Sequence, residues 1–393
     1  MKRFFLALLV SLLAVATVSA QTQNFHVLHE FNGAADGANP EGKLLRDAAG
    51  SLYGTTFAGG PDGEGTVFKI DSAGTETVLF SFDALVSGSN PASGLILDQA
   101  GNLYGTADEG PGGAGVVFKI SPDGQETLLF AFQGGLNRNP RVPSGGLLMD
   151  KAGNLYGTTI FGGNGNCQFG CGVIYRLDPA GQLRVLHAFS GGADGRRPLG
   201  ALAPDANGNL YGVAQSGGDL TCAGRFEAGC GTVFRVSRTG KLTVLHTFHG
   251  GSDGAAPPGD LLVDTVGGNL YGATSSGGAS FGTLFRISRN GTYAILHRFS
   301  GGDDGATPNG SLVLDEAGNL SGTAQTGGRG GDGTAFALSP AGQLTILHTF
   351  EADLDGAFPL GGLIRDETGH LFGVAVSNGL VQQRNGDVFE IRP

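Results

Sequence analysis

The sequence contains no tryptophan and no cluster of basic residues, and only 15% of its residues are charged. The absence of Trp removes the largest aromatic surface on which a ligand could stack. Lys and Arg number 24 against 35 Asp and Glu, which gives a formal net charge of −11. We therefore expect no nucleic-acid partner, because such binding depends on neutralising phosphates with clustered basic residues.

Long apolar runs are also missing after the N-terminus. Lys2 and Arg3 precede an apolar stretch at residues 4–16, and a small-residue cleavage site ends at Ala20. We expect residues 1–20 to be a signal peptide and the mature protein to be secreted or periplasmic. No later segment approaches the roughly 20 apolar residues that a membrane span needs. The mature chain keeps 22 basic and 35 acidic residues, a formal charge of −13.

Catalytic motifs are absent as well. No Ser-His-Asp order, nucleophile elbow, phosphate-binding loop or paired-carboxylate motif stands out. The four cysteines form two close pairs, and in an exported protein these favour two disulfides, Cys167–Cys171 and Cys222–Cys230. The alternative is a four-thiolate zinc site, which spacings of three and seven intervening residues fit less well.

What the sequence does contain is a repeat. A Leu-x-Gly core occurs seven times, at steps of 51, 52, 55, 60, 50 and 51 residues, and six copies have an aromatic residue in the middle. The copies are Leu52-Tyr53-Gly54, Leu103-Tyr104-Gly105, Leu155-Tyr156-Gly157, Leu210-Tyr211-Gly212, Leu270-Tyr271-Gly272, Leu320-Ser321-Gly322 and Leu371-Phe372-Gly373. A period near fifty residues built from short strands is typical of a propeller blade.

One repeat, residues 93–132, divides into four apolar segments separated by turns and one Gly-rich loop. The segments lie at residues 94–98, 102–106, 116–120 and 127–132. The 73 glycines fall at fixed offsets within the repeats, so they serve turns and packing rather than disorder. Each repeat therefore predicts one four-stranded antiparallel blade.

The two ends of the chain complement each other. A fourth-strand pattern stands at residues 25–31, before the first complete repeat, whereas the chain ends on a third-strand pattern at residues 386–391. We predict an all-β fold, a single seven-bladed β-propeller at residues 21–393. Residues 25–31 pair with residues 386–391, complete the last blade and close the ring, which removes free sheet edges.

The order of the motif blocks resembles the Gloeobacter–Verrucomicrobia (GloVer) repeat family. In the first repeat the blocks are Leu52-Tyr53-Gly54-Thr55-Thr56, Gly59-Gly60 and Gly65-Thr66-Val67-Phe68-Lys69-Ile70. The resemblance covers essentially the whole mature chain. It implies an exported bacterial protein and supplies no catalytic residues to transfer.

Several recurring residues are interpreted as scaffold. We expect the Gly of each Leu-x-Gly core to allow neighbouring blades to approach closely, and the Tyr hydroxyl to reach a polar partner. Five histidines share one fourth-strand position with two phenylalanines, which favours a packing role: His29, His187, His246, His297 and His348, with Phe80 and Phe130.

The candidate binding residues are charged. Five Asp-Gly pairs recur in the links between blades, at Asp36, Asp194, Asp253, Asp304 and Asp355. They are read as turns, with calcium or a cationic or sugar ligand as the alternative. Four charged residues interrupt the apolar first strands that should line the central channel: Lys43, Arg46, Asp260 and Arg365. We expect these side chains to be solvated at the rim of the channel. The alternative is that Arg46 and Arg365 bind an anion.

Blade topology places the links, the loops between second and third strands and all four cysteines on one side, called here the long-loop face. The short-turn face is opposite. Segments 137–143, 164–170 and 220–229 depart most from the repeat and belong to the long-loop face. We expect a monomeric, non-enzymatic binding or surface-associated protein for an extracellular ligand, polysaccharide or protein, with no cofactor or metal unless calcium. The alternatives are an extracellular hydrolase or lyase at the channel mouth, and a structural envelope protein.

Overall fold

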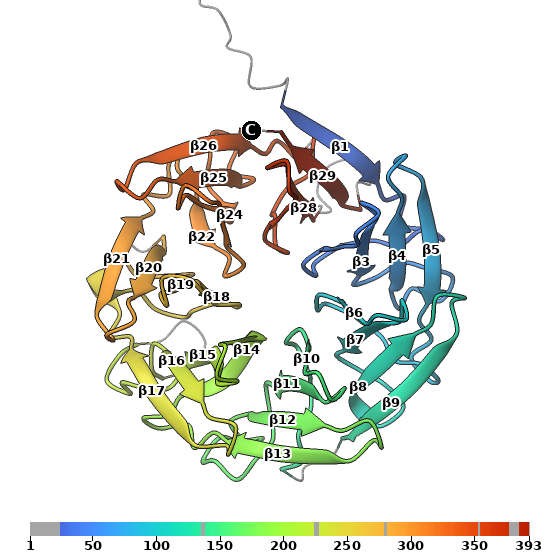
Figure 1. Ribbon diagram of the computed structural model, residues 1–393, viewed down its shortest axis with the longest axis horizontal. Helices are drawn as coiled ribbons and strands as arrows, with labels where there is room; N and C mark the ends of the chain where they lie inside the picture. The colour runs from blue at the N-terminus through green and yellow to red at the C-terminus, as the bar shows by residue number, and fades with distance from the viewer. Residues whose placement is uncertain are drawn as a thin grey trace, which may run out of the picture.

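The computed structural model is a ring of seven antiparallel blades around a central channel (Figure 1). It describes residues 24–134, 138–223, 228–278, 281–352, 354–376 and 385–392. Six blades have four strands and one has five, which confirms the predicted all-β propeller. Within these ranges the only helical segment is the short 3₁₀ turn η1 (Gly251–Asp253), and no helix is suited to crossing a membrane. The predicted signal peptide lies outside the described residues.

Strands at the same position in the repeat form concentric layers. The first, innermost layer consists of β2 (Leu45–Arg46), β6 (Ile96–Leu97), β10 (Leu148–Met149), β14 (Arg196–Pro204), β18 (Leu262–Val263), β22 (Ala306–Pro308) with β23 (Val313–Leu314), and β27 (Ile364–Arg365). The second consists of β3 (Leu52–Thr56), β7 (Leu103–Ala107), β11 (Leu155–Thr159), β15 (Leu210–Ser216), β19 (Leu270–Thr274), β24 (Leu320–Thr326) and β28 (Leu371–Ala375). The third consists of β4 (Thr66–Ile70), β8 (Gly113–Ile120), β12 (Val173–Leu177), β16 (Thr232–Val236), β20 (Thr283–Ile287), β25 (Thr334–Leu338) and β29 (Asp387–Ile391). The outermost consists of β5 (Glu76–Ser81), β9 (Glu126–Gln133), β13 (Leu183–Ala188), β17 (Leu242–Thr247), β21 (Tyr293–Arg298), β26 (Leu344–Thr349) and β1 (Phe25–Glu30).

The ring is closed by the first and last strands of the chain. β1 pairs antiparallel with β29, with Phe25 opposite Ile391 and Glu30 opposite Asp387 (Figure 1). The Phe31 amide extends the pairing by donating to the Gly386 carbonyl at 2.9 Å. The seventh blade therefore takes its outermost strand from the N-terminus, as predicted.

The Gly of each Leu-x-Gly core makes room for an aromatic ring of its own blade. Gly105 on β7 lies opposite Phe118 on β8, and a Cβ on Gly105 would stand 2.5 Å from the Phe118 ring. The same relation holds in all seven blades, with Tyr175 as the aromatic residue in the third. The expectation that Gly serves the approach of a neighbouring blade is therefore corrected, because the nearest atoms belong to the same sheet.

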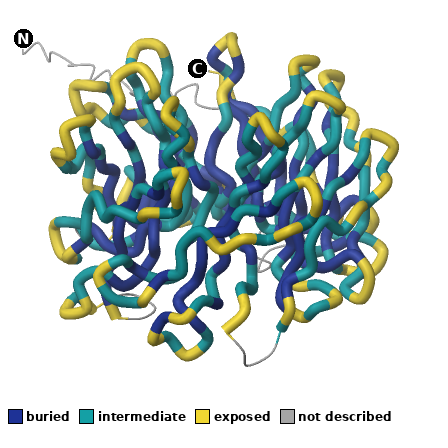
Figure 2. The backbone as a smooth tube through the Cα atoms, turned by 60° about the horizontal axis from the view of Figure 1, so that its bottom comes forward, coloured by how far each residue is buried: buried dark blue, intermediate teal, exposed yellow. Residues whose placement is uncertain are grey.

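That aromatic ring in turn makes the contact between blades. The Phe at the end of each outer strand, or directly after it, packs against the third-strand ring of the next blade. The ring centroids are 5.1 Å apart for Phe82 and Phe118 and 5.3 Å apart for Phe189 and Phe234. Seven such pairs run around the ring, each within a separate buried cluster that spans two blades. Figure 2 shows the buried strands between the exposed loops of the two faces.

The recurring Tyr reaches a polar partner, as expected, in four blades. The Tyr104 hydroxyl donates to Asp98 at 2.9 Å, and Tyr53, Tyr156 and Tyr211 make the same bond to the Asp that begins their own short turn. The accepting Asp98 also closes its turn by accepting from the backbone amides of Ala100 and Asn102. The second strand is thus tied to the turn that precedes it.

Replacing Gly105 with Ala tests the space requirement. The added methyl would overlap the Phe118 ring, so we expect the free energy of unfolding to fall by about 1–3 kcal/mol, measured by chemical denaturation. Gly302→Ala is the matched control, because Gly302 is exposed, has no positive φ and has its nearest neighbour 3.4 Å away. Equal effects of the two substitutions would contradict the overlap.

Candidate functional site

Both predicted disulfides are formed, and both lie on the long-loop face. Cys167 is bonded to Cys171 and Cys222 to Cys230. The sulfurs lie against the link that leads to the next blade, since a Cβ on Gly191 would stand 2.7 Å from the Cys171 Sγ and one on Gly250 would stand 2.7 Å from the Cys222 Sγ. The cysteine loops and the Asp-Gly links therefore share one face, as the topology predicts.

The recurring His and Asp residues are partners of one another. The His187 Nε2 lies 3.1 Å from the Asp194 carboxylate, and the same pairing recurs at His29–Asp36, His246–Asp253, His297–Asp304 and His348–Asp355 at distances of 2.7–3.4 Å. The histidines are therefore more than packing residues. Each holds the carboxylate of the link that follows its own strand.

The same carboxylates close the links. Asp194 accepts from the Ser190 amide, and the other four accept from the amide four residues earlier. Each carboxylate is thus held within its own link rather than converging with the others. Among the described residues, no group of three His, Cys, Asp or Glu side chains is arranged for a metal ion.

Arg46 and Arg365 occupy the short-turn side, each beside the turn aspartate of the preceding blade. Arg46 lies 3.7 Å from Asp366 and 3.2 Å from Glu367. Arg365 is exposed, and its charge is among the causes that lower the pKa of Asp315, after burial, which acts in the opposite direction, and hydrogen bonds. Each arginine thus lies near an acidic residue of the preceding blade.

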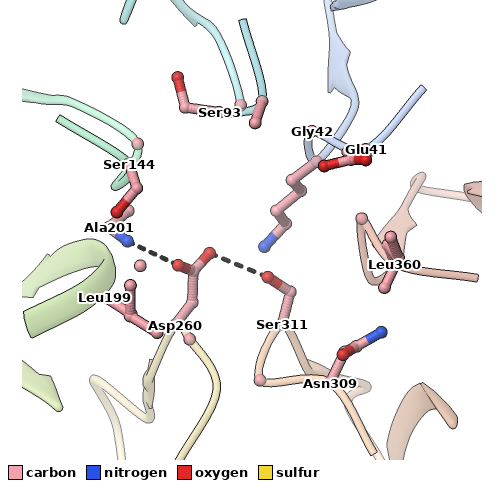
Figure 3. Close-up of a pocket in the computed structure, with 18 of the residues that line it drawn as sticks. Glu41, Gly42, Ser93, Ser144, Leu199, Ala201, Asp260, Asn309, Ser311 and Leu360 are labelled. Carbon is pink, nitrogen blue, oxygen red and sulfur yellow. Dashed lines mark hydrogen bonds between the residues drawn. The ribbon is translucent and has the colours of Figure 1, made fainter. Parts of the chain in front are cut away.

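The central channel contains a cavity of about 340 Å³ that is lined by all seven blades (Figure 3). It is formed where the chain enters each first strand. Most of its wall is small or apolar, as expected, with hydroxyl and amide groups from Ser93, Ser144, Asn309 and Ser311. A volume of this size lies at the lower end of the range for small-molecule sites.

Asp260 and Lys43 are the charged pair of this cavity. They stand at the same position of the repeat, in the fifth and first blades, where the other copies are Gly94, Gly146, Ala201, Ser311 and Gly362. The Asp260 carboxylate accepts from the Ala201 amide at 2.6 Å and from the Ser311 hydroxyl at 2.9 Å (Figure 3). These bonds, from the two neighbouring blades, fix the carboxylate in the cavity wall.

Glu41 is a functional candidate that the sequence reasoning missed. It lines the cavity, and burial together with the negative charge of Asp108 raises the pKa of Glu41 from 4.5 to about 7. Burial and the charge of Glu109 likewise raise the pKa of Asp108 to about 6. Glu41 can therefore change its protonation state near neutral pH, and it can donate or accept a hydrogen bond.

Two further cavities lie between blades on the short-turn face, away from the predicted binding face. One, of about 710 Å³, separates the third and fourth blades near Met149, Tyr156 and Arg238. The other, of about 400 Å³, separates the fourth and fifth blades near Tyr211 and Arg289. Their walls include short turns, whose sequence pattern is the same in most blades.

A model of the Gloeobacter/Verrucomicrobia repeat matches residues 14–226 and 220–393. The chain belongs to this family. No characterised protein sequence matches this Gloeobacter/Verrucomicrobia repeat protein significantly.

Solved structures share the fold of this Gloeobacter/Verrucomicrobia repeat protein at low sequence identity. The extracellular domain of a one component system of B. thetaiotaomicron has a TM-score of 0.60 and 11% identity, over 93% of this chain and 40% of that one. A protein from Lactobacillus plantarum has a TM-score of 0.52 and 18% identity, over 78% and 84%. PorZ, a surface component of the type-IX secretion system of Porphyromonas gingivalis, has a TM-score of 0.52 and 13% identity, over 90% and 46%. These likenesses show the fold alone.

Signals for the missed features were present in the repeats. The blades that lack His also lack Asp: Phe80 is accompanied by Ser87, and Phe130 by Asn137, which lies outside the described residues. This joint occurrence indicates a pair. Glu41 is likewise the only charged residue at its position, where the other copies are Ala92, Ser144, Leu199, Pro258, Asn309 and Leu360.

Asp194→Asn tests the His–Asp link through its pH dependence. Burial alone would raise the pKa of Asp194, but hydrogen bonds from His187 and Ser190 outweigh it and lower that pKa. A lowered pKa contributes stability above the ordinary carboxylate range, and that stability is lost as pH falls through the folded-state pKa. We expect the variant to be less stable by about 1 kcal/mol at pH 7 and the difference to shrink below about pH 4, measured by urea unfolding. A difference that does not change with pH would refute this linkage.

Glu41→Gln should change the pH dependence of stability in the direction opposite to Asp194→Asn. The folded-state pKa of Glu41 is raised to about 7, so between about pH 4.5 and 7 the native protein holds a proton that the unfolded chain releases. The stability of the parent therefore falls as pH rises through this interval. We expect the variant to gain stability relative to the parent across this interval and to keep the gain above it. Asp108→Asn should lower the upper end of this interval, because it removes a charge that raises the folded-state pKa of Glu41. Parallel pH profiles for parent and Glu41→Gln would contradict the raised pKa.

Proposed function

We propose that this is an extracellular binding protein that holds a small polar ligand in the central cavity, reached from the long-loop face. Export is supported by the signal-like sequence of residues 1–20 and by the two disulfides, which persist in oxidising compartments. It is also in line with the extracellular and surface locations named for two proteins of the same fold.

One observation carries the proposal: Lys43 and Asp260 introduce opposite charges into a ring position that is otherwise small and uncharged. The other five blades show that the fold does not require charge there. Burying part of a charged side chain costs free energy, so two such residues in one cavity favour a role in recognition. Because Asp260 is fixed by two hydrogen bonds, it offers a preorganised acceptor.

The lining defines the ligand class. Lys43 donates to a carboxylate, phosphate or hydroxyl group, whereas Asp260 accepts from an amine or hydroxyl. The surrounding Ser, Asn and backbone groups suit a hydroxyl-rich molecule, and the volume limits it to about the size of one sugar or amino acid. A zwitterion or a small polyol fits these conditions.

A second candidate, an extracellular hydrolase or lyase, is favoured by Glu41 alone. A carboxyl group with a pKa of about 7 is suited to general acid–base catalysis at neutral pH. The Asp-Gly carboxylates do not contribute to it, because they are held in their own links away from the cavity. Turnover of a ligand during the binding experiment would favour this candidate.

Binding should be measured as stabilisation against unfolding by amino acids, amino sugars, sugar acids and short glycans, each with and without calcium. A ligand at a hundred times its Kd should stabilise the parent by about 2.7 kcal/mol. Lys43→Met should lose most of that stabilisation, whereas the control Lys241→Met, in an exposed turn, should keep it. Binding that is equal in all three proteins would place the site outside the cavity.

A further inference from the structure

A second site lies on the long-loop face around the Cys167–Cys171 disulfide. A cavity of about 200 Å³ is lined there by the disulfide, Phe161, Gln168, Phe169 and Arg197. The two Phe rings meet edge to face with centroids 6.1 Å apart. This cavity is separate from the central one, which shares none of these residues.

Two arginines approach these rings from different links. The Arg141 guanidinium carbon lies 4.5 Å from the Phe169 centroid and 5.3 Å from that of Phe161. The Arg197 guanidinium carbon lies 5.6 Å from the Phe161 centroid. Two guanidiniums therefore lie within cation–π distance of the same aromatic ring.

Neighbouring contacts make the site rigid. Arg138 donates to the carbonyls of Asn164 and Gly165 at 2.9 and 2.8 Å and so holds the disulfide loop from the side. The Arg197 Nε donates to the Gln215 side chain at 3.3 Å, and no carboxylate of the described residues lies within ion-pair distance of the Arg197 guanidinium. Its charge is available to a ligand.

The repeat shows that the fold does not need these side chains. Arg141 and Phe161 form an isolated bridge, and the same bridge in four other blades has no arginine and no aromatic residue: Ala38 with Ala58, Ser89 with Glu109, Ala255 with Ser276 and Ala357 with Val376. Arg197 occupies a position with φ near +54° that recurs in all seven blades, where the other copies are Asn39, Asn90, Val142, Ala256, Thr307 and Phe358. An arginine there is thus dictated neither by the turn nor by the ladder.

Charge is concentrated in the same segment. The links on either side of the third blade carry Arg138, Arg141, Arg196 and Arg197 against one acidic residue, Asp194, in a chain whose net charge is −11. An acidic protein repels polyanions in general, so a local positive region is needed if one is to bind. Arginine is the side chain best suited to this, because its planar fork pairs with oxyanions through two parallel hydrogen bonds.

We propose that Arg141 and Arg197, supported by Phe161 and Phe169 on the Cys167–Cys171 loop, bind the carboxylate or sulfate group of an acidic polysaccharide. The oxyanion accepts hydrogen bonds from the two guanidiniums. The neighbouring apolar ring edges pack against the sugar ring. This site goes beyond the central cavity and does not depend on whether that cavity is occupied.

Affinity measurements with three polymers test the proposal: polygalacturonate for carboxylates, dextran sulfate for sulfates, and neutral dextran. We expect the folded protein with intact disulfides to bind at least one of the two anionic polymers and not neutral dextran, with affinity falling as salt rises. Arg141→Gln and Arg197→Gln should each weaken binding about tenfold or more. The anionic polymer that binds more tightly identifies the group recognised.

The matched control is Arg329→Gln, an exposed arginine on the long-loop face of another blade, which should change the affinity less than twofold. Arg197→Lys keeps the charge but loses the fork, so it should bind more weakly than the parent and more tightly than Arg197→Gln. The proposal is overturned if neither anionic polymer binds, if neutral dextran binds as well, or if Arg329→Gln weakens binding as much as Arg197→Gln. Circular dichroism and unfolding curves that match the parent exclude loss of fold as the cause.

Discussion

The contact on which the ring depends is a stack of three residues that crosses from one blade to the next. A Gly on the second strand leaves space, an aromatic ring on the third strand fills it, and the last Phe of the preceding blade packs on that ring. For one interface these residues are Gly105, Phe118 and Phe82. Burial of one such Phe is worth roughly 1.5–3 kcal/mol, and the stack is repeated at every interface. None of the three residues can change size without moving the other two. This explains why the seven copies of the repeat differ so little at these positions.

Most of the fold could be predicted because it is repeated. One ambiguous segment becomes a strand when seven copies share its pattern, and the mismatch between the two ends of the chain predicted the pairing of β1 with β29. The disulfides followed from spacing and compartment. The first strands were predicted too long: residues 94–98 were expected, whereas β6 pairs only at Ile96–Leu97, and Gly94 and Leu95 line the central cavity.

The site was harder to predict because its residues act in pairs that cross between segments. His297 and Asp304 were read as separate residue types, although only their distance gives each a role. Glu41 attracted no attention as a single acidic residue, since its raised pKa comes from burial and from Asp108 on the next blade. Neither burial nor the contact between blades is visible along the sequence. Where reasoning from exceptions to the repeat was applied, to Asp260 and Lys43, it led to the cavity.

Departures from the repeat are unevenly distributed around the ring. Lys43 and Asp260 line the central cavity. Arg141, Arg197 and the Cys167–Cys171 loop form the separate site on the long-loop face. A ring with seven equivalent blades offers seven equivalent surfaces, and each departure makes one of them distinct. The scaffold thus carries two chemically different sites on one face, and the paired rings of the aromatic stacks line neither cavity.

The pairing of β1 with β29 also orders events in time. β1 is synthesised first and its partner last, so the first strand must wait, with an unpaired edge, until the whole ring has been made. Every other blade can form as soon as its own four strands exist. The seventh blade is therefore a check on completeness: a chain that stops before β29 leaves an open arc with two exposed edges, and it can be recognised as unfinished by any factor that binds free strands.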